Sequence, residues 1–480
     1  MSYHQAKYDE PIVFAIQGED DCPVETTLPK ELQREELNIP NLEESQLARH
    51  FVRLSQMNYG VDTGFYPLGS CTMKYNCKFV EEAASHPGFT GLHPLQPEAT
   101  AQGAMQVMHE LSQYLAEIGG VEHITLQPCA GAHGEFTGLL LVHAYHAHNG
   151  DDRNQIILPD TSHGTNPASA AMMGYEVVEI ASKDGVVDLE ALKAALGPRT
   201  AAFMLTNPNT LGIFERDALE IARLVHESGA LLYYDGANLN AIMGKTSPGK
   251  LGFDIVHFNL HKTFATPHGG GGPGAGPIGV KDRLRDFLPV PTIGKKGDSY
   301  YLEWDLPHTI GKISNFYGNF GVLLKAWLYI RLNGGDGLRK ASERAVLNSN
   351  YLRKRLEDLL EVPYPGLRKH EFVASAKGLK ERTGVSGMDL SKRLLDHGIH
   401  APTVYFPLIV EEALMVEPTE TESKESLDMF IDTIEKILKE EPDIIKSAPH
   451  NLACGRLDEV QAARQPILNW RMLKEAGLEG

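Results

Sequence analysis

Short apolar runs alternate with helical patterns between residues 120 and 280, and each run ends in a loop of small or polar residues. Six runs predict strands, at residues 123–126, 155–158, 175–180, 201–205, 230–235 and 254–260. Most of them are apolar throughout rather than alternating, which is typical of parallel strands that are covered on both faces. The pattern therefore predicts an α/β fold with a mostly parallel sheet.

Two helices between these strands have recognisable ends. Asp188 precedes the segment LEALKAAL, which stops at Gly197-Pro198, and Asp217 precedes ALEIARLVHES, which stops at Gly229. An Asp side chain accepts hydrogen bonds from the free N–H groups of a first helical turn, and Gly favours the end of a helix. We expect both aspartates to be N-caps.

The character of the sequence changes near residue 335 to charged helical patterns with fewer strands, which predicts a smaller C-terminal α+β domain. Its last helix should end at Pro442, after apolar positions that recur at helical spacing: Leu427, Phe430, Ile431, Ile434, Ile437 and Leu438. The first 60 residues and the tail show little periodicity, and residues 11–17 and 65–76 resemble extended arms that can wrap a partner. The predicted division is an N-terminal arm and segment (1–95), a large α/β domain (96–334), a small domain (335–442) and a tail (443–480).

Composition narrows the function classes. The 480 residues carry 45 Lys and Arg against 63 Asp and Glu, a formal net charge of −18, which argues against nucleic-acid binding. The longest uncharged stretch, Thr263 to Val280, is rich in Gly and Pro, so no membrane span is expected. The start lacks an apolar signal region, and five scattered cysteines do not suit a disulfide framework. We expect a cytoplasmic protein.

Two ionisable residues follow neighbouring apolar runs. Asp235 ends the run 230–235, and Lys262 follows the run 254–260. Ligands of open parallel sheets bind beyond the carboxyl ends of the strands. Alone, Asp235 could cap a turn and Lys262 could extend to solvent. Together they match what pyridoxal phosphate needs, because a buried lysine can form a Schiff base and a carboxylate can hold a protonated pyridine nitrogen.

The remaining strand-end loops offer the other groups that this cofactor needs. The backbone N–H groups of residues 130–132 open a helix and can bind a phosphate. His163 offers a flat ring for stacking, and Asn207 offers a donor for the phenolic oxygen. Each assignment alone is weak, whereas five consecutive loops that each supply one group form a consistent site.

Two rival motifs fit less well. The glycines at 274, 276 and 279 match a dinucleotide fingerprint in spacing, but no strand leads directly into them. His257 and His261 are four residues apart, which suits a zinc site on a helix, yet this stretch predicts a strand. We expect neither a dinucleotide site nor a metal site.

Long motifs of the chain resemble the glycine decarboxylase P-protein family, and within it the subunit 2 of the split bacterial form, which carries the cofactor lysine. The resemblance runs from about residue 40 into the tail. Its motifs are FYPLGSCTMKYN (65–76), LQPCAGAHGE (126–135), SHGTNPASAAMMGYEVV (162–178), TNPNTLGIFE (206–215), YYDGANLNAIMG (233–244) and NLHKTFATPHGGGGPGAGPIGV (259–280).

The resemblance implies a fold-type I pyridoxal-phosphate enzyme and a role for each matching residue. Lys262 would form the Schiff base, Asp235 would partner the pyridine nitrogen, and His163 would stack on the ring. The implied cofactor-binding set also includes Ala130, Gly131 and Ala132 at the phosphate, and Asn207, Thr210, Ala237 and His261 around the ring. The chain departs from the family pattern at His133, where Gln is frequent, and at Cys77, where proline is usual.

The resemblance also implies a reaction and partners. Glycine would lose carbon dioxide, and its aminomethyl group would pass to the lipoyl arm of the H-protein, in an α2β2 assembly with a subunit 1. The glycine run 269–272 could form a flexible lip for that arm, which substitution of Gly271 by Ala would test. Ser70 and Thr72 are candidates to bind the glycine carboxylate.

Two alternatives stay open. Aminotransferases, desulfurases and aldol-type lyases share the same sheet, Asp and Lys, and Arg368 or Arg382 could bind the α-carboxylate in an aminotransferase. A non-catalytic subunit that stabilises a partner is the other alternative. The presence of Asp235, His163 and Lys262 argues against it, because a scaffold has no need for a buried lysine.

Overall fold

The computed structural model describes residues 10–16, 18, 26–34, 39–269, 272 and 274–477. Seven strands form the central sheet in the order β1-β9-β8-β7-β6-β2-β3, and within it β8, β7, β6, β2 and β3 run parallel while β9 is antiparallel to both of its neighbours. The predicted mostly parallel sheet is confirmed. The strands are β1 (His123–Thr125), β2 (Gln155–Pro159), β3 (Glu176–Ile180), β6 (Thr200–Thr206), β7 (Leu231–Gly236), β8 (Ile255–Phe258) and β9 (Ile278–Val280).

The last of the six predicted strands is wrong at its carboxyl end. β8 stops at Phe258, and the short helix α9 (Leu260–Thr263) follows it. Leu260 is fully buried, so it continues the apolar pattern although its backbone is helical. A short apolar run does not distinguish strand from helix. His261 and Lys262 therefore lie on a helical turn, and the prediction that His257 and His261 share a strand is wrong.

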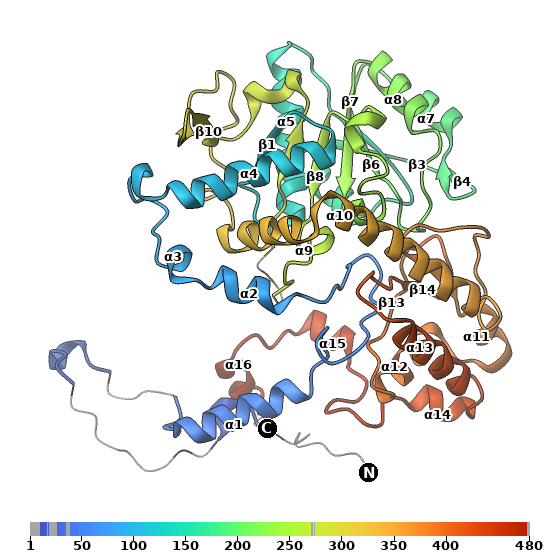
Figure 1. The fold of residues 1–480 in the computed structure, drawn as a ribbon. Coiled ribbons are helices and arrows are strands. Elements are labelled where there is room, and N and C mark those ends of the chain that lie inside the picture. The colour runs from blue at the N-terminus through green and yellow to red at the C-terminus, as the bar shows by residue number, and fades with distance from the viewer. Residues whose placement is uncertain are drawn as a thin grey trace.

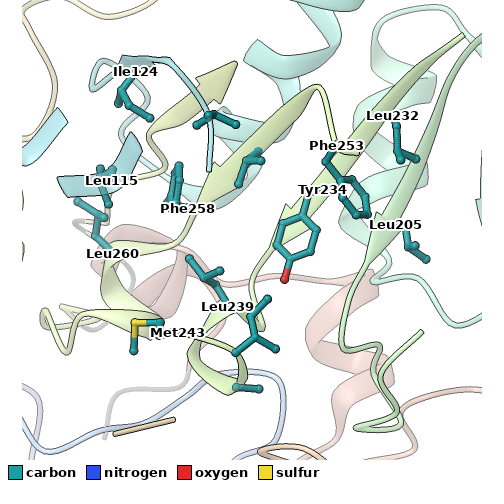
Figure 2. Packing of buried hydrophobic residues seen from close by; sticks show 14 of the residues in the cluster. Leu115, Ile124, Leu205, Leu232, Tyr234, Leu239, Met243, Phe253, Phe258 and Leu260 are labelled. Carbon is teal, nitrogen blue, oxygen red and sulfur yellow. The ribbon is translucent and has the colours of Figure 1, made fainter. Parts of the chain in front are cut away.

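Helices cover both faces of the sheet (Figure 1). One apolar cluster joins the strands to α4 (Gln102–Gly119), α8 (Ala218–Glu227) and α10 (Phe320–Leu356), and Figure 2 shows Leu205, Leu232 and Phe258 in it. A second cluster joins the other face to α5 (Gly131–His148) and α6 (Thr165–Met172). This double cover explains why every residue of β2, β6, β7 and β8 is buried.

One of the two predicted N-caps is confirmed. The Asp188 carboxylate accepts the N–H groups of Glu190 and Ala191 at the start of α7 (Leu189–Ala195). Asp217 directly precedes α8, but its side chain makes no capping hydrogen bond. Its backbone has φ −94° and ψ 20°, not the extended conformation that directs a cap side chain at the first turn.

The C-terminal part has its own small sheet and core. Strands β12 (Phe372–Ser375), β14 (Ala413–Val416) and β13 (Thr403–Val404) are antiparallel in that order. They pack with α11 (Lys377–Thr383), α12 (Gly387–Asp396) and α13 (Lys424–Ile437) around Phe372 and Phe430. α10 contributes to the cores of both parts, and Gly334, with φ 59°, interrupts its helical geometry. The division at residues 334 and 335 stays a prediction.

Pro442 does not end the last helix of this part. α13 stops at Ile437, and Pro442 is the first residue of the next helix, α14 (Pro442–Ser447). Proline is tolerated at the first helical position because the N–H group it lacks has no partner there. The predicted helix end is wrong for this reason.

The N-terminal region contains more helix than its weak periodicity indicates. α1 (Glu44–Gln56) begins with a capping box between Glu43 and Gln46, and α2 (Lys78–Ala84) and α3 (Pro87–Thr90) follow. Of the predicted arm 11–17, Val13–Ala15 form a 3-10 turn and residue 17 lies outside the described residues. The predicted arm 65–76 has neither helix nor named strand, and Leu68 forms a β-bridge with Val416.

Short elements complete the chain. They are the hairpin β10 (Thr292–Lys296) and β11 (Ser299–Glu303), the hairpin β4 (Ser182–Lys183) and β5 (Val186–Val187), the tail helices α15 (Glu459–Arg464) and α16 (Trp470–Glu475), and the 3-10 turns Lys30–Leu32, Glu98–Thr100, Leu239–Ala241, Pro248–Leu251 and Asp282–Phe287. No described helix is long and apolar enough to cross a membrane.

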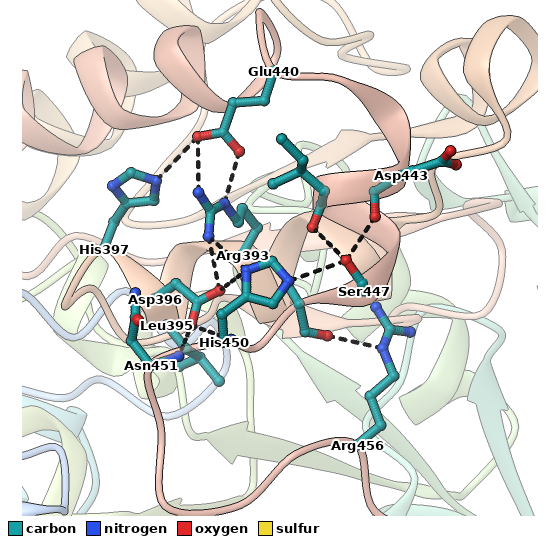
Figure 3. A network of polar contacts seen from close by, with 12 residues as sticks. Arg393, Leu395, Asp396, His397, Glu440, Asp443, Ser447, His450, Asn451 and Arg456 are labelled. Carbon is teal, nitrogen blue, oxygen red and sulfur yellow. Dashed lines mark hydrogen bonds and ion pairs between the residues drawn. The ribbon is translucent and has the colours of Figure 1, made fainter.

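Polar contacts attach the start of the tail to α12 (Figure 3). The Asp396 carboxylate accepts the backbone N–H groups of His450 and Asn451 at 2.6 and 2.8 Å, and Arg393 binds both Asp396 and Glu440. Further along, the Trp470 ring stacks on Phe14, with 5.7 Å between the ring centroids. The segments around Phe14 and Trp470 therefore contact each other, and α16 lies below the sheet in the view of Figure 1.

Candidate cofactor site

Asp235 lies at the carboxyl end of β7 with its side chain fully surrounded. Oδ2 accepts hydrogen bonds from Asn166 Nδ2 at 3.1 Å and Thr206 Oγ1 at 3.0 Å, and Oδ1 accepts the N–H of Ala237 at 3.0 Å. Nε2 of His257, on the neighbouring strand β8, is 3.3 Å from Oδ1. The sequence predicts that this carboxylate needs partners, and the fold provides four.

These contacts keep Asp235 ionised despite its burial. Burial by itself raises the pKa of a carboxyl, but His257, the Ala237 N–H, Lys262 and His163 together hold the pKa of Asp235 below its usual value. The ionised form of Asp235 is therefore favoured, with two histidines and a lysine near it.

Lys262 lies on α9, directly after β8. The adjacent segment is fixed by Lys74, whose Nζ donates to the Thr263 carbonyl at 2.9 Å and to Asn240 Oδ1 at 2.6 Å, and pairs with Glu420 at 2.8 Å. Lys74 is buried and comes from the extended segment 65–76. No local sequence pattern indicates this role, although Lys74 belongs to the motif at residues 65–76.

The N-terminus of α5 is open. Ala130 precedes the helix in an extended conformation, Gly131 and Ala132 begin it, and no described side chain caps it. A Cβ atom added to Gly276 would lie 2.1 Å from the Ala130 carbonyl oxygen, so the backbone at Gly276 packs directly against this turn. Free N–H groups at the start of an 18-residue helix are suited to a phosphate.

The His163 ring is held at one edge. Its Nδ1 lies 2.9 Å from Thr165 Oγ1, and the Thr165 N–H donates to the same atom at 3.3 Å. Burial and the nearby Lys262 lower the pKa of His163, so the imidazole is neutral at pH 7. The ring of Phe406 meets it edge to face at 5.8 Å.

Three other predicted residues differ in what they can still bind. Asn207 Oδ1 accepts the Glu215 N–H at 2.9 Å, whereas its buried Nδ2 has no hydrogen-bond partner among the described residues. Thr210 Oγ1 already donates to the Thr161 carbonyl at 2.8 Å. The Ala237 N–H is used by Asp235. Asn207 is thus the predicted ring-lining residue with a free donor.

His261 precedes Lys262 on α9 and packs near His268, with 5.3 Å between the rings. Burial, together with the charge of Lys262, lowers the pKa of His261 to about 3. Its buried Nδ1 has no hydrogen-bond partner within the described part of the chain. His261 is therefore a neutral ring beside the lysine.

A second polar cluster, formed by His370, Glu371 and Glu417, was missed by the sequence analysis. All three are fully buried, and they offer ligand atoms within 4.8 Å of one another, an arrangement that could hold a metal ion. Burial raises the pKa of Glu417 to about 7 and that of Glu371 well above its usual range, so a proton also binds readily there. No motif marks these residues, because their burial arises from contacts between distant segments.

Ser70 and Thr72, the two candidates for carboxylate binding, lie against this cluster. The Ser70 N–H donates to Glu371 at 2.8 Å and the Thr72 N–H donates to Glu417 at 2.9 Å. Their φ angles of 65° and 54° are in the left-handed region, which side chains other than glycine rarely adopt. The backbone N–H groups of both residues are therefore already engaged.

The chain resembles known proteins in sequence and in fold. The model of the family "Glycine dehydrogenase, C-terminal domain" matches residues 341–453, and that of "Aminotransferase class-V" matches residues 134–295. A solved structure described as glycine decarboxylase (P-protein) of the glycine cleavage system, in inhibitor-bound form, is similar with a TM-score of 0.73, at 21% identity over 86% of this chain and 93% of that one. A NifS-like protein has a TM-score of 0.61 at 17% identity, covering 78% of this chain and 99% of its own.

The fold is thus that of the fold-type I class of pyridoxal-phosphate-dependent enzymes, and the open helix N-terminus, the ionised Asp235 and the free amide of Asn207 fit that cofactor. Full-length relatives narrow the assignment. The probable glycine dehydrogenase (decarboxylating) subunit 2 of Thermococcus gammatolerans is 55% identical over 99% of both chains, and that of Thermoplasma volcanium is 57% identical over 98% of this chain and all of its own. The chain belongs to the family of glycine dehydrogenase (decarboxylating) subunit 2.

Proposed function

We propose that this chain is the cofactor-carrying subunit of a glycine-decarboxylating enzyme, which passes the aminomethyl group of glycine to the lipoyl arm of an H-protein. The observation that carries the proposal is the full-length identity of 54 to 57% to relatives named glycine dehydrogenase (decarboxylating) subunit 2. The geometry supports it, because Asp235 and Lys262 lie together at the carboxyl edge of the sheet.

Each residue has a defined role in this proposal. Lys262 Nζ is the amine that attaches the cofactor, and the first-turn N–H groups at Ala130, Gly131 and Ala132 bind its phosphate. The Asp235 carboxylate keeps a proton on the pyridine nitrogen. His163 and His261 would contribute neutral rings, and the unpartnered Asn207 Nδ2 would be available to donate to the phenolic oxygen; Thr210 and Ala237 would line the same space.

Bound pyridoxal phosphate supplies an electron sink that accepts the electron pair left when carbon dioxide departs. The contribution of the protein is electrostatic, since Asp235 is oriented by three hydrogen-bond donors and lies beside His257 before any ligand arrives. His163 lies close enough to Asp235 and Lys262 to interact with their charges. Its lowered pKa keeps the ring neutral, so it does not neutralise the Asp235 carboxylate.

The aminotransferase alternative receives less support. The Arg368 guanidinium donates to the carbonyl groups of Tyr364, Pro365 and Leu367, which holds its own loop together. Arg382 is exposed on α11. Arg368 is thus already engaged and Arg382 faces solvent, which weakens the aminotransferase hypothesis.

The proposal includes a partner subunit 1 in an α2β2 assembly in the cytoplasm. The term "subunit 2" in the names of the relatives supports a partner. Exposed apolar side chains gather on the terminal segments, among them Phe14, Phe51, Val52 and Leu468, and such residues are suited to contact another chain. The proposed lip at residues 269–272 includes Gly270 and Gly271, which lie outside the described residues.

The first experiment tests cofactor attachment. The purified chain with pyridoxal phosphate should develop an absorption band near the visible edge, and borohydride reduction should fix the cofactor to the peptide that contains Lys262. Lys262→Ala should abolish both signals, whereas Lys250→Ala, at an exposed lysine, should keep them. Absence of the band in the wild-type chain, with and without subunit 1, would contradict the proposal.

The second experiment tests the substrate. With subunit 1 and lipoylated H-protein, the chain should exchange labelled bicarbonate into the carboxyl group of glycine. An H-protein without its lipoyl group should give no transfer of the aminomethyl group. Exchange with alanine but not with glycine would overturn the assignment of the substrate.

A further inference from the structure

Glu135 is a buried acid that the proposed function does not use. It lies on the second turn of α5, with 5% of its surface exposed. Oε1 is 2.8 Å from Thr165 Oγ1, and Oε2 is 3.1 Å from Ser169 Oγ. Thr165 in turn contacts His163, so Glu135 is connected to the proposed stacking ring through one hydroxyl group.

The positions of the protons in this chain follow from the donors available. The Thr165 backbone N–H can only donate, and it lies 3.3 Å from His163 Nδ1, so Nδ1 carries a lone pair and no proton. The neutral ring must then carry its proton on Nε2. Thr165 Oγ1 is only 2.9 Å from the same lone pair, a distance that is favourable when the hydroxyl proton points to Nδ1.

A hydroxyl group has a single proton. An ionised Glu135 can only accept the Thr165 hydroxyl proton. When that proton points to Nδ1 instead, the 2.8 Å contact between Thr165 and Glu135 needs a proton from the carboxyl group itself. The hydrogen-bond geometry therefore indicates that Glu135 is a carboxylic acid that donates to Thr165 and accepts from Ser169.

The surrounding charges are consistent with a neutral Glu135. Burial and the Asp235 carboxylate raise the pKa of Glu135 to about 7, against the lowering effects of Thr165, Ser169 and Lys262. Asp235 accepts three hydrogen bonds and lies beside His257, so it is the better anion, whereas Glu135 has two hydroxyl groups. Two adjacent carboxyl groups in such different surroundings divide into one acid and one base. Tyr233 is a further titratable group near Glu135, beside Asp235 and Lys262, and burial raises its pKa.

We propose that Glu135 is a protonated positioning residue, which through Thr165 holds His163 as the tautomer with its proton on Nε2. The inference rests on the proposed function, because it concerns the ring assigned there to stack on the cofactor. Nε2 has no recorded partner within the described ranges and is available to donate to a ligand. When Glu135 loses its proton, the Thr165 hydroxyl turns toward the carboxylate, and His163 loses a donor at Nδ1.

Infrared difference spectroscopy on the full chain without cofactor tests the protonation of Glu135. At pH 6 the wild-type chain should show the carbonyl stretch of a buried carboxylic acid, which Glu135→Gln removes and which fades as the pH rises through about 7. Glu179→Gln, at an exposed glutamate on β3, should leave the band in place. Absence of a band that depends on Glu135 would overturn the proposal.

Nitrogen NMR of histidine-labelled protein, assigned with His163→Gln, tests the tautomer. The wild-type spectrum should show a protonated Nε2 at pH 6. In Thr165→Val only the 3.3 Å backbone N–H contact still holds Nδ1, so this preference should weaken although Glu135 is intact. A protonated Nδ1 in the wild-type chain would overturn the proposal.

Cofactor titration then connects this arrangement to binding. In the wild-type chain the affinity for pyridoxal phosphate should fall above pH 7, where Glu135 loses its proton. Glu135→Gln can still donate to Thr165 at every pH, so it should keep the wild-type affinity of pH 6 and show no such fall. Glu135→Ala and Thr165→Val should weaken binding by about tenfold at both pH values. Equal losses in Glu135→Gln and Glu135→Ala would contradict the proposal. If Lys262 failed to attach the cofactor, the proposed function would fail, while the infrared and NMR readouts would still decide the state of Glu135.

Discussion

Nε2 of His257 lies 3.3 Å from Oδ1 of Asp235, at the point where β7 and β8 run side by side. The Tyr233 hydroxyl lies 2.8 Å from Nδ1 of the same ring. The Asn259 Nδ2 group, which can only donate, lies 3.0 Å from Nε2, so the neutral ring offers its lone pair there and its Nδ1 proton to Tyr233. When the fully buried His257 ring is protonated, its charge favours the ionised form of Asp235.

The first prediction concerns this pair. His257→Leu removes the largest of the effects that lower the pKa of Asp235, so the carboxyl should hold a proton more readily and interact less with a pyridinium nitrogen. We expect cofactor affinity to fall by about tenfold, which corresponds to roughly 1.4 kcal/mol. Absorbance titration with pyridoxal phosphate measures it. His143→Leu, at an exposed histidine of α5, is the control, and an equal loss in both variants would show that His257 has no specific role.

The second prediction concerns the buried ion pair of Lys74 and Glu420. Lys74→Met leaves the Glu420 carboxylate without its cation in a position where only 9% of that side chain is exposed. Breaking a buried pair in this way costs about 3–5 kcal/mol. Urea denaturation should show a loss of this size, and the double variant Lys74→Met with Glu420→Gln should recover part of it.

The surface pair of Lys78 and Asp62 provides the matched control. Its side chains are 61% and 52% exposed, so Lys78→Met should change the free energy of unfolding by less than about 1 kcal/mol. A loss in Lys74→Met that is no larger than this control would mean that the buried pair does not fix α9.

The third prediction concerns the turn at Ala130. A Cβ atom at Gly276 would lie 2.1 Å from the Ala130 carbonyl oxygen, so Gly276→Ala must displace the open end of α5. We expect the affinity for pyridoxal phosphate, and also for inorganic phosphate as a competitor, to fall by at least about tenfold. Gly321→Ala on α10 meets no atom within 4 Å and should leave both affinities unchanged. Normal phosphate competition in Gly276→Ala would argue against a phosphate site at this turn.

The sequence predicts the central sheet well because its inner strands are buried at every position, which produces continuous apolar runs. It brings Asp235 and Lys262 together for the same reason, since both follow neighbouring runs. It does not reveal Glu135, Glu371 or Glu417. Ser70 contacts Glu371 across 301 positions of the chain, so the burial of these acids depends on tertiary contacts that no local pattern records.

The last prediction uses one of these acids. Burial raises the pKa of Glu417 to about 7 from an ordinary value of 4.5, so the folded chain binds this proton more tightly than the unfolded chain. Below pH 4.5 the carboxyl is protonated in both states and has no effect on stability. As the pH rises toward 7, the unfolded chain loses the proton first, and the free energy of unfolding falls.

Glu417→Gln removes this titration while its amide oxygen can still accept the Thr72 N–H. The variant should therefore gain stability relative to the wild type as the pH rises, with little difference at pH 5 and about 1–3 kcal/mol at pH 8. Urea denaturation at both pH values measures the difference, and Glu425→Gln, at an exposed position of α13, should give none. A stability difference that is flat with pH, or that falls as the pH rises, would show that Glu417 is ionised in the folded chain and that Lys74 and Lys262, the nearby cations, already stabilise its charge.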